Sequence, residues 1–181
     1  MSIEQFDPFE DRLCRDIRNE LSTSFMQTLA QLSMKPVEET AEKYLARDLG
    51  PVYRNYIKER LASYSRAVDF ILKRKIADPF ARAIVLWDCE LFFEVHELLE
   101  EEWLAASGEE KLVLQAMIRA AGVYVQLGHG NVKGARKMAA KAVEVLTEHR
   151  EAVPVGFDLD LLLEKLRKGD PLPPKLFLAG E

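Results

Sequence analysis

The chain has 181 residues, of which 48% are hydrophobic and 30% are charged. This balance is typical of a globular protein with a buried core and excludes a disordered chain. Residues 1–80 carry 13 basic and 13 acidic side chains, whereas residues 81–181 carry 12 and 17, so the acidic second half argues against nucleic acid and against an anionic membrane as partners.

Cysteine usage and hydropathy predict a soluble cytoplasmic protein. The first ten residues have no basic segment followed by an apolar run, so no signal peptide is expected. No stretch approaches the roughly 18 consecutive apolar residues that would span a membrane. Cys14 and Cys89 lie far apart and outside any Cys-x-x-Cys motif, so both are expected to be small apolar core residues in a reducing compartment.

Three helices are predicted in residues 1–78, which we expect to form a helical N-terminal extension or partner-binding arm. An apolar residue recurs every fourth position from Phe9 to Leu29, which predicts a helix over about residues 7–33. Pro36 opens a second helix that ends at Gly50-Pro51. A third helix, with apolar and aromatic residues at three-and-four spacing, runs from Tyr53 to a stop at Asp78-Pro79.

The segment 79–106 allows two interpretations. Asp78 is a good N-cap for a helix with Pro79 at its first position. If Asp88 caps a fresh start, residues 79–87 and 89–106 form a helical hairpin, which we favour. The alternative is one long helix through the whole segment.

Two further helices and a short last one complete the prediction. One helix runs from Glu109 to Gly128, the next starts at its N-cap Asn131 and reaches about His149, and Asp158 caps the last helix over residues 159–168. Three prolines between residues 171 and 174 predict an extended tail. The expected fold is all-α, a multi-helical bundle of about seven to eight helices, with the bundle at 79–168 and a Pro-rich tail at 169–181.

One predicted helix concentrates the chemistry of the chain. Seven of the fifteen residues from Asp88 to Glu102 are acidic and none is basic. Helical spacing of about 100° per residue sorts them into faces. The acidic stripe consists of Glu90, Glu94, Glu97 and Glu101; the core-facing side of Phe92, Val95, Leu99 and Trp103; and the boundary of Phe93, His96 and Glu100.

Because His96 and Glu100 are four residues apart, their side chains are expected to meet. A carboxylate on an imidazole can serve a metal site, a proton-transfer pair or packing alone. His-Glu-x-x-Glu lacks the second histidine of the zinc-protease motif, and Glu94-Val95-His96 lacks the spacing of di-iron bundles. An oxygen-rich site for manganese or magnesium, built from His96, Glu97 and Glu100, remains open.

The interpretation that we favour is a structural polar network. Gln115 and Arg119 lie on one face of the following helix, and a bridge from Arg119 to Glu97 or Glu100 would neutralise part of the acidic stripe. As a third possibility, the acidic face could dock a basic partner. On a later helix, Lys133, Arg136, Lys137 and Lys141 form a basic strip, which is interpreted as a solvated face or a docking surface for Glu-rich neighbours, with an anion site as the alternative.

The motifs in this half resemble those of a known family. The pattern Phe-Glu-x-His-Glu-x-Leu-Glu-x-x-Trp at residues 93–103 is followed by Leu-Gln-Ala-Met-Ile-Arg-Ala-Ala at 114–121, Gly-Asn-x-x-Gly-Ala at 130–135 and Gly-Phe-Asp at 156–158. Taken in this order, they resemble the domain-of-unknown-function 309 family over roughly residues 80–166. The resemblance implies a compact all-α fold in which the His-Glu helix packs against the Gln-bearing helix, and it implies no reaction.

The chain departs from the family pattern at three places. Val95 stands for the usual alanine, Arg119 for a frequent glutamine, and Asp88-Cys89 for an Asn/Gly-rich turn. The permanent cation of Arg119 favours an ion-paired network over a metal.

Together these observations favour a non-catalytic binding or interaction module, with a protein partner or a second copy of the chain as candidate partners. The alternative is a hydrolase-like enzyme that uses His96 and nearby glutamates with a divalent metal, the one cofactor that the residues suggest. The candidate site residues are Phe93, Glu94, His96, Glu97, Glu100, Trp103, Gln115 and Arg119, with His96, Glu97 and Glu100 as candidate metal ligands.

Overall fold

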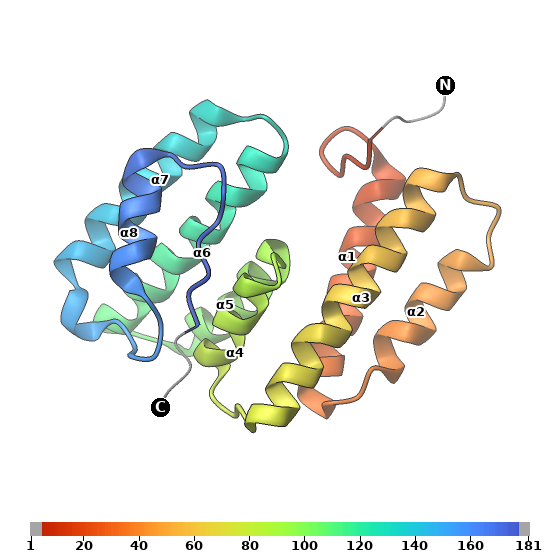
Figure 1. The fold of residues 1–181 in the computed structure, drawn as a ribbon, viewed down its shortest axis with the longest axis horizontal. Coiled ribbons are helices and arrows are strands. Elements are labelled where there is room, and N and C mark those ends of the chain that lie inside the picture. Colours follow the sequence, from red (N-terminus) through yellow and green to blue (C-terminus); the bar gives the residue numbers. More distant parts are fainter. Residues whose placement is uncertain (1–4, 178–181) are drawn as a thin grey trace. The chain divides into compact units, whose positions relative to one another are not determined.

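Helices account for most of the computed structural model, which describes residues 5–177 (Figure 1). The fold is all-α, and the described residues contain eight α-helices and one short 3₁₀ helix, as the hydrophobic periodicity predicts. The chain divides into two compact units between Lys75 and Ile76, close to the composition change at Asp78-Pro79.

The N-terminal unit contains α1 (Arg12–Gln31), α2 (Lys35–Leu45) and α3 (Pro51–Arg74). α1 begins later than the predicted residue 7, because the carboxylate of Asp11 caps it by accepting a hydrogen bond from Cys14 N at 2.6 Å. Phe9, assigned to the apolar stripe, therefore lies outside the helix and is 46% exposed. The core of this unit includes the stacked rings of Phe25 and Tyr64, whose centroids are 3.9 Å apart.

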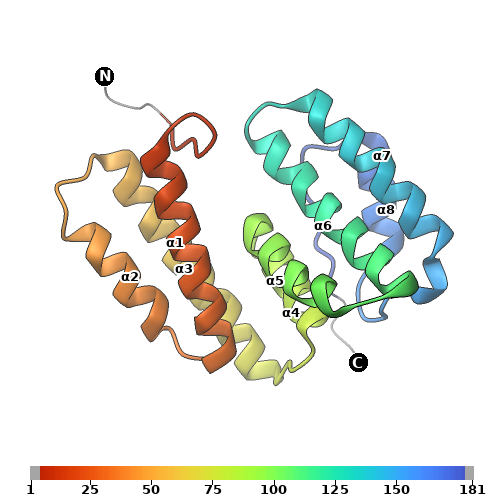
Figure 2. The same ribbon diagram turned by 180° about the vertical axis from the view of Figure 1, so that it is seen from behind.

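The C-terminal unit contains α4 (Pro79–Asp88), α5 (Phe92–Ala105), α6 (Gly108–Gly128), α7 (Val132–Glu148), the 3₁₀ turn Arg150–Ala152 and α8 (Leu159–Lys168). Each of these α-helices packs against the next one in the chain, as Figure 2 shows from the second side. Its core includes buried side chains from all five α-helices, among them Trp87 of α4, Leu99 of α5, Met117 of α6, Leu146 of α7 and Leu162 of α8. This arrangement makes α5 an outer helix of its unit that rests on α6.

Side-chain caps set the helix starts that the sequence predicts. Asp78 accepts from Ala81 N, Asn131 from Gly134 N and Asp158 from Leu161 N. Each bond satisfies one of the backbone N–H groups that the first turn of a helix leaves without a partner.

The segment 79–106 forms two helices, so the hairpin interpretation is confirmed, but Asp88 does not cap the second one. α4 includes Asp88, the chain turns through Glu90 with φ of 60°, and α5 begins after Leu91 without a side-chain cap. A residue at the last position of a helix cannot present its carboxylate to a helix that starts four residues later. The Asp88 carboxylate instead binds backbone from the far end of the chain.

Residues 170–177 form what we call the C-terminal strap, an extended segment that returns to α4. The carboxylate of Asp88 accepts hydrogen bonds from the backbone N–H of Leu176 at 2.7 Å and of Phe177 at 3.0 Å. The indole Nε1 of Trp87 donates to the carbonyl of Pro174 at 3.0 Å, and the Leu176 side chain is fully buried. The prolines predict the extended backbone, whereas its docking on α4 is a result of the tertiary structure.

Neither Cys14 nor Cys89 forms a disulfide bond. Cys14 is fully buried, as predicted for a core residue, and burial raises its pKa to about 11. Cys89 is only half-buried, because it lies in the turn that follows α4.

In the part of the chain that the structure describes, no helix combines the length and the apolar character needed to cross a bilayer.

Candidate functional site on helix α5

The outer helix α5 buries one face and exposes another. Val95, Leu98 and Leu99 are buried, whereas Glu100 and Glu101 are exposed. Two members of the predicted core face, Phe92 and Trp103, are only half-buried.

Glu94 is the clearest departure from the predicted faces. It was assigned to the acidic stripe with Glu90, Glu97 and Glu101, but its side chain is fully buried. The buried arc of α5 includes Val95 and Leu98, one and four residues further on, so Glu94 shares the apolar side of the helix. Glu94 therefore does not belong to the solvent-facing acidic surface.

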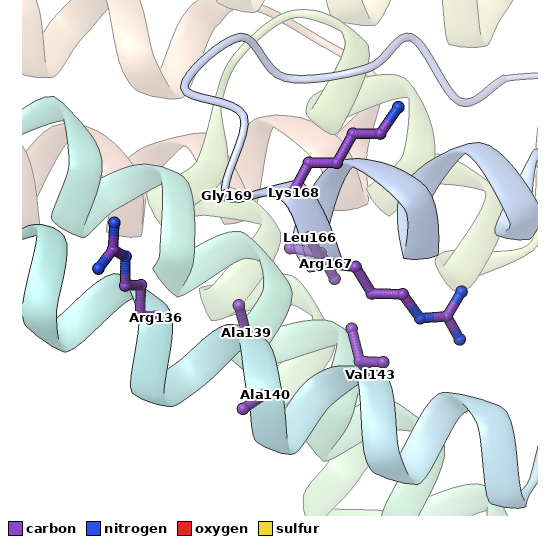
Figure 3. A pocket seen from close by; sticks show the side chains of 8 residues that line it. All are labelled: Arg136, Ala139, Ala140, Val143, Leu166, Arg167, Lys168 and Gly169. Carbon is purple, nitrogen blue, oxygen red and sulfur yellow. The ribbon is translucent and has the colours of Figure 1, made fainter.

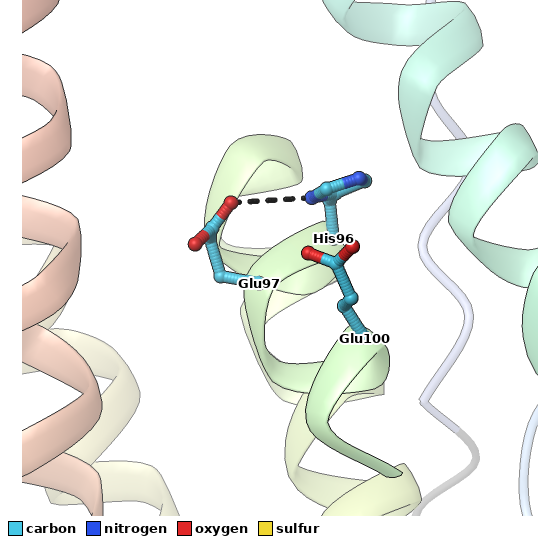
Figure 4. Close-up of side chains that lie close together, drawn as sticks. All are labelled: His96, Glu97 and Glu100. Atoms are coloured by element: carbon cyan, nitrogen blue, oxygen red, sulfur yellow. Dashed lines mark hydrogen bonds and ion pairs between the residues drawn. The ribbon is translucent and has the colours of Figure 1, made fainter. Parts of the chain in front are cut away.

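Three residues of the predicted site converge on the outer side of α5. Nδ1 of His96 lies 3.2 Å from Oε1 of Glu97, and ligand atoms of His96, Glu97 and Glu100 all lie within 4.8 Å of one another. Figure 4 shows the Glu97 carboxylate directed toward the imidazole and the Glu100 carboxylate beside it. The side chains of His96 and Glu97 are 38% and 34% exposed, so solvent reaches this cluster.

The contact with Glu97 orients the imidazole. A carboxylate only accepts hydrogen bonds, so in a neutral His96 ring that makes this contact the proton lies on Nδ1. The sequence predicts contact between His96 and Glu100, which are one helical turn apart. In the structure the hydrogen bond of His96 is to the adjacent Glu97, and a carboxylate oxygen of Glu100 lies within 4.8 Å of the imidazole ligand atom. The ring of Phe93 lies 6.4 Å from the imidazole, nearly parallel to it.

Three other predicted site residues, Trp103, Gln115 and Arg119, are not part of this cluster of ligand atoms. Lys111 Nζ lies 4.4 Å from the centre of the Trp103 ring, so Trp103 makes a cation–π contact at the α5–α6 turn. Gln115 and Arg119 are half-buried on α6. Within residues 5–177, neither forms a hydrogen bond or ion pair with His96, Glu97 or Glu100. The predicted Arg119 bridge is therefore not formed there.

The acidic side chains of α5 are not neutralised by basic residues of the same helix. The helix contains no lysine or arginine, and Glu100, Glu101 and Glu102 lie near its C-terminus, where the helix dipole disfavours negative charge. Among the described residues these three glutamates form no ion pair. The glutamates of α5 thus make this helix electronegative, and a bound cation would reduce the electrostatic repulsion among them.

One structured polar and aromatic region was missed by sequence reasoning. Trp87, Phe92 and Tyr124 form an aromatic cluster with ring centroids 5.1–5.4 Å apart, beside the docked strap. Burial raises the pKa of Tyr124 to about 12, and the nearby charge of Asp170 adds to the shift. The aromatic residues were visible in the sequence, but contacts between positions 87 and 174 have no local signal.

Comparison with known proteins supports the family resemblance. The family model described as "Domain of unknown function (DUF309)" matches residues 80–138, which cover α4, α5, α6 and the first turns of α7. The match includes the motifs at residues 93–103, 114–121 and 130–135, so the resemblance is confirmed over this segment. No curated protein and no solved structure matched the chain.

Proposed function

We propose that the C-terminal unit is a binding module that holds a divalent cation on α5. This helix lies within the segment that matches the family model, residues 80–138, and the description of that family names no activity. The ligands would be His96, Glu97 and Glu100. The observation that carries the proposal is the convergence of these three ligand atoms within 4.8 Å of one another.

The separation of the ligand atoms fits a single ion. Metal–ligand distances of about 2.0–2.6 Å place two ligands of one ion at most about 4–5 Å apart. The three ligand atoms lie within 4.8 Å of one another, and Nδ1 of His96 and Oε1 of Glu97 are 3.2 Å apart, so their separations fall within this limit. Helix α5 supplies all three ligands within five residues, which fixes their backbone positions.

The donor set favours a particular class of metal. Two carboxylates suit hard ions such as Mg²⁺ and Mn²⁺, and an imidazole suits later transition metals. Mn²⁺ accepts both donor types, and water would complete its coordination. Nδ1 of His96 faces Glu97, so metal coordination by Nε2 would preserve this contact, while coordination by Nδ1 would replace it.

Electrostatics supports the same proposal. A divalent ion would offset the mutual repulsion of the α5 carboxylates and their unfavourable position near the helix C-terminus. Binding to the folded state alone would also stabilise the protein, with a gain that grows with ion concentration. A metal-dependent hydrolase would need this same ion and, in addition, a substrate site. Ion binding is therefore the property to test first.

Isothermal titration of chelator-treated protein with Mn²⁺ tests the proposal. We expect one site per chain in the wild type and an affinity at least about tenfold lower in His96→Ala and Glu100→Gln. Glu101→Gln is the matched control, because Glu101 is exposed on the same helix but outside the cluster; it should bind like the wild type.

Two results would contradict the metal site. One is the absence of saturable Mn²⁺ binding in the wild type. The other is an equal loss of affinity in Glu100→Gln and Glu101→Gln, which would indicate diffuse attraction of cations to the acidic helix rather than coordination.

A further inference from the structure

A solvent-open groove with a cationic rim lies between α7 and α8. None of its lining residues belongs to the α5 cluster. Its volume is about 350 Å³, near the lower end of the range for ligand pockets. The lining contains three cationic side chains, Arg136, Arg167 and Lys168, and no acidic one. A positive groove is notable in a chain with a net charge of −5.

The floor of the groove is apolar. It includes Ala140 and Val143, one turn apart on α7, and Leu166 on α8. Figure 3 shows Arg136 and Arg167 extending to opposite sides of these apolar side chains. Ala140 is exposed and Val143 is half-buried, so a ligand can reach the floor from solvent.

The cations on α7 are not neutralised by the described part of the chain. Lys133, Arg136, Lys137 and Lys141 are exposed, and within residues 5–177 none of them forms an ion pair. The first turn of α7 has no acidic residue, so basic side chains lie near the end of the helix where the dipole favours negative charge. An anionic partner would offset this unfavourable arrangement.

The rim on α8 is held in place by neighbouring side chains. Nη2 of Arg167 donates to Oγ1 of Thr147 at 3.3 Å, and Nζ of Lys168 donates to Oε1 of Glu164 at 2.5 Å. Arg136 on the opposite side has no such contact among the described residues. Arg136 is therefore the rim cation with most freedom to bind a carboxylate.

We propose that this groove docks an acidic amphipathic helix of a partner protein. Apolar side chains of the partner, spaced at three or four residues, would rest on Ala140 and Val143, and its glutamates or aspartates would pair with Arg136, Arg167 and the lysines of α7. This proposal does not depend on a metal at α5.

The shape of the charged surface favours a peptide over other anions. The α7 cations extend from Lys133 to Lys141, a length of about 12 Å at 1.5 Å per residue, which one phosphate cannot bridge. Single-stranded nucleic acid binds through aromatic side chains that stack on bases, and the groove lining contains no aromatic residue. An aliphatic floor instead accommodates aliphatic side chains.

Fluorescence anisotropy with a designed peptide tests the proposal on the full chain. The probe is a fluorescein-labelled helical peptide of about 14 residues, four turns, with leucine on one face and glutamate elsewhere. We expect saturable binding at about 50 mM salt that weakens at about 500 mM. The same peptide with glutamine in place of glutamate should bind more weakly.

Two variants separate the rim from the floor. Arg136→Glu should lower the affinity at least about fivefold, while Arg136→Lys keeps the charge and should retain most of the binding. Ala140→Trp fills the floor without changing charge and should also weaken binding. Helical content and thermal unfolding, followed by circular dichroism, verify that each variant is folded.

Three results would overturn the proposal: no saturable binding of the glutamate peptide, binding that is unaffected by both Arg136→Glu and Ala140→Trp, or tighter binding of polyuridine RNA than of the peptide at the same salt. The last result would assign the surface to nucleic acid.

Discussion

At the scale of single residues, Tyr124 combines burial with a polar group that the fold does not use. Its side chain is 5% exposed, and within the described residues its hydroxyl has no hydrogen-bond partner. A buried polar group without a partner costs about 1–3 kcal/mol. The aromatic ring stabilises the unit through its contacts with Trp87 and Phe92, while the hydroxyl opposes folding.

We expect Tyr124→Phe to raise the free energy of unfolding by about 1 kcal/mol, because it removes the hydroxyl and keeps the ring. Urea unfolding followed by tryptophan fluorescence measures this change. Tyr124→Ala is the comparison and should lower stability by about 3 kcal/mol through loss of the ring. A loss of stability in the phenylalanine variant would show that the hydroxyl makes a favourable interaction.

The same residue gives a pH dependence. The pKa of Tyr124 is about 12 in the folded chain and 10 for an ordinary tyrosine, so folding favours the protonated form. This contribution is complete below pH 10 and is lost as the pH rises from 10 to 12. Tyr44, whose pKa burial also raises to about 12, contributes over the same range in the N-terminal unit.

Ultraviolet titration of tyrosinate measures this effect. The Tyr124→Phe variant should lose one late-titrating group and show a smaller decline in stability between pH 10 and 12. An unchanged titration curve would mean that Tyr124 ionises like an exposed phenol.

At the scale of elements, the C-terminal strap is held to α4 mainly through Asp88. Its carboxylate accepts two backbone hydrogen bonds, from Leu176 and Phe177, and it is half-buried. The nearby ion pair of Lys175 with Glu90 spans 3.5 Å, and both of its side chains are 63% exposed. Hydrogen bonds from backbone N–H groups to a half-buried carboxylate contribute more to the free energy of unfolding than exposed ion pairs do.

We therefore expect Asp88→Ala to destabilise the C-terminal unit by about 2 kcal/mol and to increase hydrogen exchange at Leu176 and Phe177. Glu90→Gln is the matched control, because it removes the adjacent exposed charge, and it should change stability by less than about 0.5 kcal/mol. Equal effects of the two substitutions would mean that general electrostatics, and not the two backbone bonds, holds the strap.

The elements also show which local signals suffice for prediction. Asp78, Asn131 and Asp158 cap helices as predicted, because an N-cap depends only on the residues of the following turn. Asp88 is also an aspartate, but its carboxylate binds the backbone of Leu176 and Phe177, which lie 88 and 89 residues further along the chain. A sequence pattern cannot separate these two uses of an aspartate.

At the scale of the whole molecule, the chain consists of two units, and both tryptophans, Trp87 and Trp103, lie in the second one. Tryptophan fluorescence therefore reports on the C-terminal unit, whereas circular dichroism reports on both. The C-terminal unit has its own core, formed by α4 to α8 and the strap. These features allow the units to be tested separately.

We expect residues 76–181 expressed alone to unfold cooperatively, with a fluorescence midpoint within about 5 °C of that in the full chain. Thermal unfolding of the two proteins in parallel measures this. A much lower midpoint, or a gradual loss of signal, would show that the C-terminal unit depends on residues 1–75 for its stability.

The sequence by itself determined the helical class, most helix boundaries, three caps and the segment that matches the family, because these follow from periodicity and from residues within one or two turns. It also indicated His96, Glu97 and Glu100, because residues on one helix have a fixed spacing.

The tertiary structure alone decided which side of each helix is covered. It placed Glu94 in the interior and brought the strap onto Trp87 and Asp88. Among the described residues it formed no ion pair between Arg119 and Glu97 or Glu100. It also joined α7 and α8 around a cationic groove. Such contacts depend on how helices distant in the sequence pack, and packing reflects the sum of many weak contacts and not any single local pattern.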